Sequence, residues 1–367
     1  MALILASFLI SLFITGILLR YRSWHLPFSG DHDLISPQKF HQKVTARIGG
    51  IAIALVCLLL LGICEVLNPN KTKPFILITL AAIPIYVSGI VEDLTKQVNN
   101  KVRLFAAFFS GLLFLFLFEI HSIRLDIPII ESLTTYPIIA IMFLTFSIAG
   151  LSHAFNIIDG LNGLASMVAI ISLTAILYVA IKVQDQVVIN LSLVMIGSIA
   201  GFFVWNFPKG LIFLGDGGAY LIGFLIAVAS IILVVNNGTV SPWFAFMVNA
   251  YPITETLFTI WRRSIRRDKN SLLPDRAHFH SLIYRRISLW SKNRKEMSLS
   301  FANNSTASCF LWLFTSLGAI PAILWWNITI NLVLSSFVFI IIYIYSYRMI
   351  LKINLLTVKY QSRKNKS

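Results

Sequence analysis

Charged side chains are scarce in this chain. Of its 367 residues, 57% are hydrophobic and only 12% are Asp, Glu, Lys or Arg, and the mean hydropathy is +0.81. Soluble domains carry about twice that share of charge, so the composition excludes an ordinary soluble fold. Cysteine is also rare. Cys57, Cys64 and Cys309 lie in or beside apolar runs without metal-binding spacing, so we predict neither a disulfide framework nor a cysteine metal site.

Acidic residues are rarer than basic ones, 15 against 30, and the formal net charge is +15. In a soluble protein this balance would suggest a nucleic-acid partner. In so apolar a chain, basic residues set membrane topology and attract anionic substrates. We therefore expect a lipid bilayer and anionic ligands as partners, and no nucleic acid.

Apolar runs dominate the chain. A bilayer-crossing helix needs about 20 such residues. The first run lacks the cleavage pattern of a signal peptide, so we expect a retained helix. The sequence predicts an all-α polytopic membrane helix bundle, a single domain over 1–350 with about eleven transmembrane helices. The expected spans are 2–19, 50–67, 74–91, 102–120, 136–152, 163–182, 187–206, 217–235, 240–261, 307–326 and 329–350.

Basic residues predict the orientation. With the C-terminus in the cytoplasm, every Lys and Arg lies on the cytoplasmic side except Lys71, Lys73, Arg124 and Lys182. This positive-inside bias places the N-terminus outside, because an odd number of spans puts the termini on opposite sides. A basic tail is expected to touch anionic headgroups. The predicted cytoplasmic segments are 20–49, 92–101, 153–162, 207–216, 262–305 and the tail 351–367.

Five acidic residues fall at the predicted inner ends of spans or in very short connections: Glu92, Asp93, Asp159, Asp216 and Glu255. A carboxylate at membrane depth is costly and by default suggests a function. Short connections hold their residues near one plane. The sequence therefore predicts one shared site at the inner membrane surface.

The string NIIDGLNGLA at 156–165 is the most specific functional signal in the sequence. Asn156, Asp159 and Asn162 recur every third residue and share one side of a helical turn, and Gly160 and Gly163 open space beside them. A helix cap would explain one such residue. The whole set favours a ligand site.

Two other acidic strings predict metal or phosphate chemistry. The pair Glu92-Asp93 would bind Mg²⁺ or accept a proton, unless it is a solvated helix end. Asp216 lies in FLGDGG at 213–218, where amides at a helix start would hold phosphate and Asp216 would hold the bridging metal. A tight turn is the plain alternative for that string.

Glu255 follows Pro252 inside a predicted span. The proline is expected to break or kink that helix. A buried glutamate needs a partner, and nearby arginines are the candidates. The alternative role for Glu255 is structural, as an anchor for the basic loop 262–305.

Basic residues form two further clusters in the predicted cytoplasmic loops. Arginine and histidine suit a diphosphate or a phosphorylated lipid headgroup. Two histidines without a cysteine are a weak zinc signal, and positive-inside bias alone would also explain both clusters. The clusters are Lys39, His41, Lys43 and Arg47 before the second span, and Arg262, Arg276, His278 and His280 in the loop 262–305.

Together these strings resemble the polyprenyl-phosphate N-acetylhexosamine-1-phosphate transferases. That family includes undecaprenyl-phosphate GlcNAc-1-phosphate transferases and the phospho-MurNAc-pentapeptide translocases. The resemblance covers about residues 31–290 in the family's order and includes the acidic pair Glu92-Asp93. The other motifs are QKFH with RIGG at 38–50, NIIDGLNGLA at 156–165, FLGDGG at 213–218 and PITETLFTIWRR at 252–263.

The resemblance implies transfer of a sugar 1-phosphate, commonly GlcNAc 1-phosphate, from a UDP-sugar to polyprenyl (undecaprenyl) phosphate, with release of UMP. It implies Mg²⁺ as cofactor, with Mn²⁺ as a possible substitute, and leaves a homodimer open. The expected catalytic residues are Glu92, Asp93 and Asp159, and the expected metal ligands are Asp216 and Asp93. The expected substrate-binding residues are Lys39, His41, Arg47, Asn156, Asn162, Glu255, Arg262, Arg276, His278 and His280.

The chain departs from the family pattern at three positions. Glu92 begins a pair that is usually Asp-Asp, Asn162 stands where some branches have an acid, and Ser281 stands where a third histidine is common. The run of consecutive histidines typical of the pentapeptide translocases is absent. We therefore predict that the chain lies outside that branch.

Two alternatives come from other functional classes. A transporter or flippase of an anionic lipid-linked sugar would use intramembrane acids, but near the bilayer midplane rather than at one face. A membrane scaffold would not need carboxylate–glycine clusters aligned on one side. Release of UMP from a UDP-sugar, dependent on polyprenyl phosphate, would separate these classes.

Overall fold

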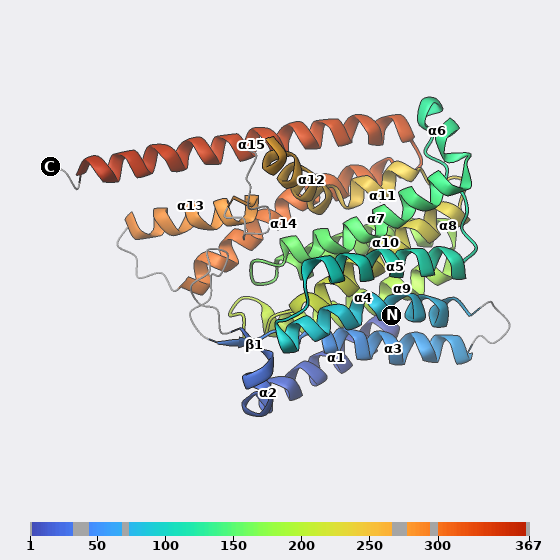
Figure 1. Ribbon diagram of the computed structural model, residues 1–367, viewed down its shortest axis with the longest axis horizontal. Coiled ribbons are helices and arrows are strands. Elements are labelled where there is room, and N and C mark those ends of the chain that lie inside the picture. The colour runs from blue at the N-terminus through green and yellow to red at the C-terminus, as the bar shows by residue number, and fades with distance from the viewer. Residues whose placement is uncertain (1, 32–43, 68–72, 266–276, 294–299, 365–367) are drawn as a thin grey trace.

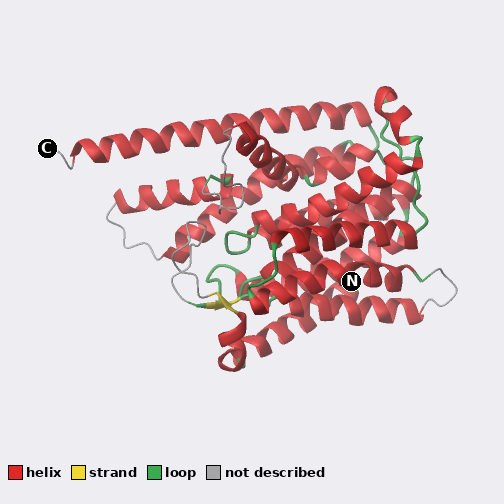
Figure 2. Cartoon of the chain, in the orientation of Figure 1, coloured by secondary structure: helices red, strands yellow, loops and turns green. Residues whose placement is uncertain are grey.

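A computed structural model of the chain describes residues 2–31, 44–67, 73–265, 277–293 and 300–364. Most of them are helical (Figure 1, Figure 2), which confirms the all-α fold class. Within these ranges the helices are α1 (Ala2–Arg20), α2 (Arg22–Ser29), α3 (Gly50–Leu67), α4 (Pro74–Thr95), α5 (Asn100–Leu117), α6 (Pro128–Thr134), α7 (Pro137–Ile158), α8 (Leu164–Val183), α9 (Gln186–Asn206), α10 (Gly215–Asn236), α11 (Pro242–Val248), α12 (Ala250–Ile265), α13 (Phe279–Asn293), α14 (Ser300–Leu324) and α15 (Thr329–Lys364), and the strands are β1 (Gly30–Asp31) and β2 (Thr45–Ala46).

Nine helices of the described part are long and apolar enough to cross a membrane, and they coincide with nine of the eleven expected spans. The expected span 50–67 forms α3, whose apolar stretch Gly50–Val66 is shorter. The multi-pass membrane fold is thus confirmed, whereas the count of eleven and the orientation stay predictions. The nine helices are α1, α4, α5, α7, α8, α9, α10, α14 and α15.

The expected span 240–261 is divided into two helices. α11 ends at Val248 and α12 begins at Ala250, with Asn249 between them. Pro252 therefore does not break the helix where it stands. It lies in the first turn of α12, where a missing backbone N–H costs no helical hydrogen bond. The break comes three residues earlier than the sequence predicted.

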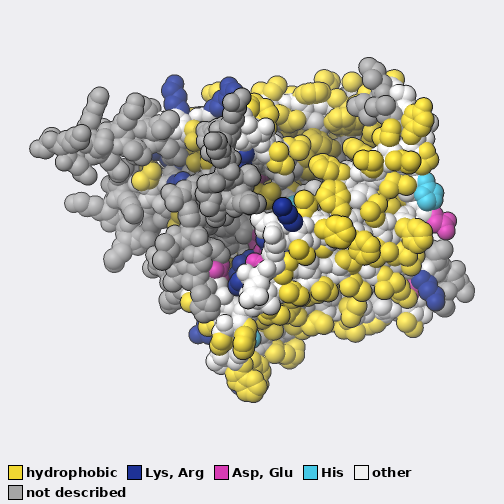
Figure 3. All heavy atoms as spheres, in the orientation of Figure 1, with side chains coloured by type: hydrophobic (Ala, Val, Ile, Leu, Met, Phe, Trp, Pro, Cys, Tyr) yellow, Lys and Arg dark blue, Asp and Glu magenta, His cyan; other side chains and the backbone are white. Residues whose placement is uncertain are grey.

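Helix α10 is the centre of the bundle. Every residue from Gly215 to Val234 is buried, and α10 packs against α4, α7, α3 and α8. A helix that is apolar on all sides needs such enclosure. Apolar side chains cover most of the visible surface around the bundle, while most visible Lys and Arg side chains gather toward the end that carries α2, β1 and α13 (Figure 1, Figure 3).

Glycines let α3 and α4 approach α10 backbone to backbone. A Cβ at Gly50 would lie 2.3 Å from the Cα of Gly218, and a Cβ at Gly89 would lie 2.6 Å from the Cα of Gly217. Small residues permit such close packing between membrane helices. The first turn of α10 is thereby fixed between the start of α3 and the C-terminal half of α4.

A short hairpin holds the segment before α3. β1 pairs antiparallel with β2, with Gly30 opposite Ala46. The N–H of Phe213 donates to the carbonyl of Ala46 at 2.8 Å, and the N–H groups of Gly49 and Gly50 donate to the carbonyls of Phe213 and Leu214 at 2.9 Å. These hydrogen bonds join the RIGG string to the FLGDGG string.

Candidate active site

The carboxylate of Asp93 caps the N-terminus of α10. Asp93 is fully buried near the end of α4. Its Oδ1 accepts the N–H of Asp216 and its Oδ2 accepts the N–H of Gly217, each at 2.9 Å. The unpaired N–H groups of a helix start favour a negative charge at this place. The acidic pair and the FLGDGG string therefore belong to one structure, although more than 100 residues separate them.

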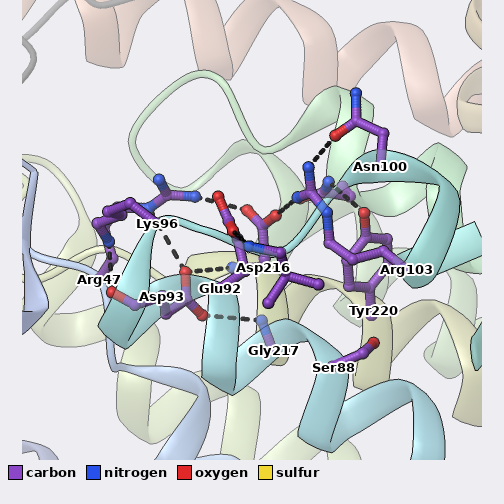
Figure 4. Close-up of polar contacts among 12 residues, drawn as sticks. Arg47, Ser88, Glu92, Asp93, Lys96, Asn100, Arg103, Asp216, Gly217 and Tyr220 are labelled. Atoms are coloured by element: carbon purple, nitrogen blue, oxygen red, sulfur yellow. Dashed lines mark hydrogen bonds and ion pairs between the residues drawn. The ribbon is translucent and has the colours of Figure 1, made fainter.

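Asp216 lies between two arginines (Figure 4). Nη2 of Arg47 donates to its Oδ1 at 2.5 Å, and Nη1 of Arg103 pairs with its Oδ2. Nε of Arg47 also lies 3.5 Å from Oδ1 of Asp93. Burial opposes a charge on Arg47, but the carboxylates of Asp216 and Asp93 outweigh it and raise the pKa of the guanidinium above its usual value. Two carboxylates and two guanidinium groups thus meet at the start of α10.

Gly215 makes this arrangement sterically feasible. Its φ of +79° lies in the left-handed region, which glycine adopts without penalty. A Cβ there would lie 2.1 Å from the carbonyl oxygen of Arg47 and 2.5 Å from Oδ2 of Asp93. The position therefore requires glycine for both its backbone conformation and its space.

The string NIIDGLNGLA forms the end of α7 and the turn before α8. Nδ2 of Asn156 donates to the hydroxyl of Tyr220 on α10 at 3.0 Å. Asp159 is the partly buried C-cap of α7, and its charge acts on Arg47. Asn162 serves the loop itself: its Nδ2 donates to the carbonyl of Pro208 at 3.0 Å, and its N–H donates to Oδ1 of Asn304 at 2.7 Å.

Glu255 holds the stretch of chain that carries His278 and His280, which we call the histidine segment. It is fully buried on α12, and its Oε1 accepts the N–H of Phe279 at 2.9 Å and faces Nδ1 of His278 at 3.2 Å. Its Oε2 accepts the hydroxyl of Tyr343 at 2.9 Å. The arginine partner expected for Glu255 from the sequence stays a prediction.

The histidine segment reaches the NIIDGLNGLA loop. The rings of His278 and His280 stack with centroids 5.3 Å apart and planes 7° apart. A Cβ at Gly160 would lie 2.6 Å from Nε2 of His280. Gly160 follows Asp159 directly, so the structure brings the histidine segment to the acidic loop.

The remaining expected site residues are more peripheral or lie outside the described part. Oε2 of Glu92 accepts the N–H of Val98 at 2.8 Å and closes the turn after α4. Arg262 is buried near the end of α12. Lys39, His41 and Arg276 lie outside the described residues. The catalytic, metal-binding and substrate-binding roles expected for all these residues stay predictions.

Three residues beside the cluster were not among the expected site residues: Arg103, His153 and Tyr220. The His153 and Tyr220 rings lie 4.8 Å apart, and Nε2 of His153 is buried without a hydrogen-bond partner among the described residues. Helical spacing would have found two of them, since Tyr220 lies one turn after Asp216 and His153 about one turn before Asn156. Nothing in the sequence separates Arg103 from the other cytoplasmic basic residues.

The carboxylates of Asp93 and Asp216 fit a magnesium ion better than zinc. The described residues contain no group of three or more His, Cys, Asp or Glu side chains that could hold a metal, as a structural zinc site would require. Mg²⁺ typically takes one or two carboxylates and completes its shell with water and substrate phosphates. Asp93 and Asp216 would supply the two carboxylates, and a phosphate-bearing substrate would have to complete the shell.

Known proteins with similar sequences include members of two groups of transferases. A probable undecaprenyl-phosphate N-acetylglucosaminyl 1-phosphate transferase of Bacillus subtilis (strain 168) is 30% identical over 68% of this chain and 69% of that protein. An undecaprenyl-phosphate alpha-N-acetylglucosaminyl 1-phosphate transferase of Thermotoga maritima is 25% identical over 69% of this chain and 72% of that protein. A phospho-N-acetylmuramoyl-pentapeptide-transferase of Streptococcus uberis is 30% identical over 64% of this chain and 74% of that protein.

The two groups match to similar extents, so the predicted place outside the pentapeptide branch stays a prediction. The sequence profile of glycosyl transferase family 4 matches residues 75–234. This range contains Asp93, Arg103 and Asp216, which meet at the start of α10, and also Asp159. The resemblance read from the motifs is confirmed, and the chain belongs to glycosyl transferase family 4.

Proposed function

We propose that the protein transfers an N-acetylhexosamine 1-phosphate from a UDP-sugar to polyprenyl phosphate at the cytoplasmic face of the inner membrane. UMP is released and a polyprenyl-diphospho-sugar remains in the bilayer, as the first membrane step of a cell-envelope polysaccharide. The names of the B. subtilis and T. maritima relatives specify undecaprenyl phosphate and N-acetylglucosamine. These are therefore the first acceptor and the first sugar to test.

One arrangement carries this proposal: Arg47, Arg103 and the N-terminus of α10 converge on Asp93 and Asp216 (Figure 4). Guanidinium groups bind phosphate oxygens well. The reaction joins two phosphate-bearing substrates, and Arg47 and Arg103 would neutralise part of their charge. The cluster lies toward one end of the bundle, where a transferase meets a soluble nucleotide, rather than at mid-height.

In the reaction, a phosphate oxygen of polyprenyl phosphate attacks the β-phosphorus of the UDP-sugar. The bond between that phosphorus and the bridging oxygen breaks, and UMP leaves with the oxygen and the electron pair. A phosphate monoester has a second pKa of about 6 and is largely deprotonated near pH 7, so no strong general base is needed. Asp93, whose two oxygens accept backbone N–H groups, orients Asp216 and α10 rather than removing a proton.

Arg47 and Arg103 bind phosphate oxygens beside Asp216 and stabilise the charge that develops on them. Asp216 and Asp93 would hold Mg²⁺, or Mn²⁺ in its place, and the bound cation would supply further charge neutralisation. His280, packed against Gly160, and His278, stacked on His280, bind the nucleotide sugar beside the acidic loop.

An apolar cavity suits the prenyl chain of the acceptor. It has a volume of about 610 Å³ and lies among α7, α10, α11, α12 and α15. Its lining includes Leu151 and Ala154, within two turns of Asn156, and Ile253 and Leu257 near Glu255. A lipid tail in this cavity would place its phosphate near the carboxylate cluster.

Filling this cavity should weaken acceptor binding selectively. Gly150 lines the cavity, and a Cβ there would have open space around it. Gly150→Phe is expected to raise KM for polyprenyl phosphate about tenfold, because each displaced CH₂ costs about 0.8 kcal/mol. KM for the UDP-sugar should not change. Gly62→Phe, at a similarly open position outside the cavity lining, is the control. Equal acceptor KM values in all three proteins would contradict this placement.

A purified-protein assay tests the function as a whole. The full chain in vesicles is expected to release UMP from UDP-GlcNAc only when undecaprenyl phosphate and Mg²⁺ are both present. Omission of either should reduce the release to background. A panel of other UDP-N-acetylhexosamines would then define the sugar. No UMP from any member of the panel would contradict the proposal and favour a flippase.

A further inference from the structure

Glu255 and the last span together hold the histidine segment in place. The carboxylate of Glu255 is fully buried and faces three hydrogen-bond donors, the N–H of Phe279, Nδ1 of His278 and the hydroxyl of Tyr343. A buried carboxylate is stable only when its oxygens are satisfied in this way. Two of the donors belong to the histidine segment and the third to α15, so Glu255, itself on α12, joins α12 and α15 to the histidine segment.

Tyr343 is buried within an aromatic cluster, so its hydroxyl has a fixed direction. Its ring lies 5.1 Å from that of Phe279 and 5.5 Å from that of Phe258. One turn further along α15, the hydroxyl of Tyr347 donates to the carbonyl of Ala277 at 2.9 Å. Helix α15 therefore contacts the histidine segment both directly and through Glu255.

The hydrogen bond to Glu255 also sets the chemistry of His278. A carboxylate only accepts, so Nδ1 of His278 must carry the hydrogen. Nε2 is then the ring nitrogen left for other contacts. His278 stacks on His280, which packs on Gly160 beside Asp159. A change at Glu255 would therefore alter the orientation of both histidines at the acidic loop.

We propose that Tyr343 and Glu255 are positioning residues that orient His278 and His280 for binding the nucleotide sugar. This inference rests on the proposed function and extends it to a side chain of the last span. It assigns to Glu255 an indirect role in place of the direct substrate contact expected from the sequence. In this assignment the hydroxyl of Tyr343 acts on the histidines through the carboxylate of Glu255.

Tyr343→Phe tests this role, because it removes one hydroxyl and keeps the aromatic ring. The variant is expected to bind UDP-GlcNAc about tenfold more weakly, the order expected for one hydrogen bond to a charged group. In turnover, KM for UDP-GlcNAc should rise by the same factor. The kcat and the KM for polyprenyl phosphate should stay within about twofold, the pattern of lost ground-state binding. Tyr345→Phe is the matched control, since Tyr345 lies on the same helix and is 69% exposed.

The possible outcomes distinguish a failure of the positioning role from a failure of the proposed transfer reaction. Unchanged UDP-GlcNAc binding in Tyr343→Phe would overturn the positioning role, and so would a loss of kcat at unchanged KM, which indicates general damage. If Glu255 contacted the substrate directly, Glu255→Gln would weaken binding and Tyr343→Phe would not. A wild-type protein that binds UDP-GlcNAc but releases no UMP would refute the reaction, while the binding comparison would still decide the positioning role.

Discussion

Asp216→Asn is expected to lower kcat for UMP release by about 10²–10³-fold, the range found when a group that stabilises transition-state charge is removed. The carboxylate of Asp216 is the common partner of Arg47 and Arg103 and a proposed magnesium ligand. An amide is isosteric but neutral, so it would neither hold the two guanidinium groups nor bind a hard cation well. Steady-state UMP release with both substrates saturating measures the effect.

The other end of α10 supplies a matched control for this variant. The carboxylate of Asp185 is also buried, and its Oδ2 accepts from the side chains of Asn236 and Asn237 at 3.2 and 3.1 Å. Asp185→Asn removes a charge from the same bundle at a distance from the candidate site. Its kcat should stay within about twofold of wild type. A kcat for Asp216→Asn within tenfold of wild type would refute the role given to Asp216.

Gly215→Ala is expected to abolish transfer and to lower the free energy of unfolding by at least about 2 kcal/mol. The left-handed backbone of Gly215 alone costs an L-residue about 1–2 kcal/mol. The new Cβ would also overlap the carbonyl of Arg47 and the carboxylate of Asp93, so either the hairpin segment or the cap of α10 must move. Thermal unfolding in detergent and UMP release measure the two effects.

Gly62→Ala is the control for this substitution, because a Cβ at Gly62 would have no neighbour within 4 Å. In the middle of α3 the change should be neutral or slightly stabilising, since alanine favours helix over glycine. If Gly215→Ala retained wild-type melting and activity, the close contact between the start of α10, Arg47 and Asp93 would be wrong.

Much of the fold could be predicted from local sequence. Long apolar runs with few charges have one stable form in a bilayer, a helix whose backbone groups are satisfied internally. Most expected spans are therefore helices within a few residues of their predicted bounds. The divided span at Asn249 could not be predicted, because the position of a break depends on which helices pack against it and not only on the nearest proline.

The candidate site was predictable in outline for a similar reason. Acidic residues, glycines and asparagines are energetically unfavourable within apolar helices, so their presence there indicates a functional site. The strings NIIDGLNGLA and FLGDGG were located in this way. The contact that each residue of these strings makes could not be predicted from the sequence. Asn162 ties its loop to Pro208 and Asn304, contacts that depend on segments far away in the chain.

The sequence by itself determined that this protein is a membrane helix bundle of the transferase family, with its acidic residues at the ends of helices. Only the tertiary structure decided which of them meet. Glu92 and Asp93 are neighbours in sequence, but successive residues of a helix point about 100° apart. Asp93 therefore faces the amides of α10, while Glu92 closes the turn at Val98. Asp93 and Arg103 meet at Asp216 because close packing at Gly89 and Gly217 brings α4 against α10, and α5 packs on α4. No local pattern encodes this contact.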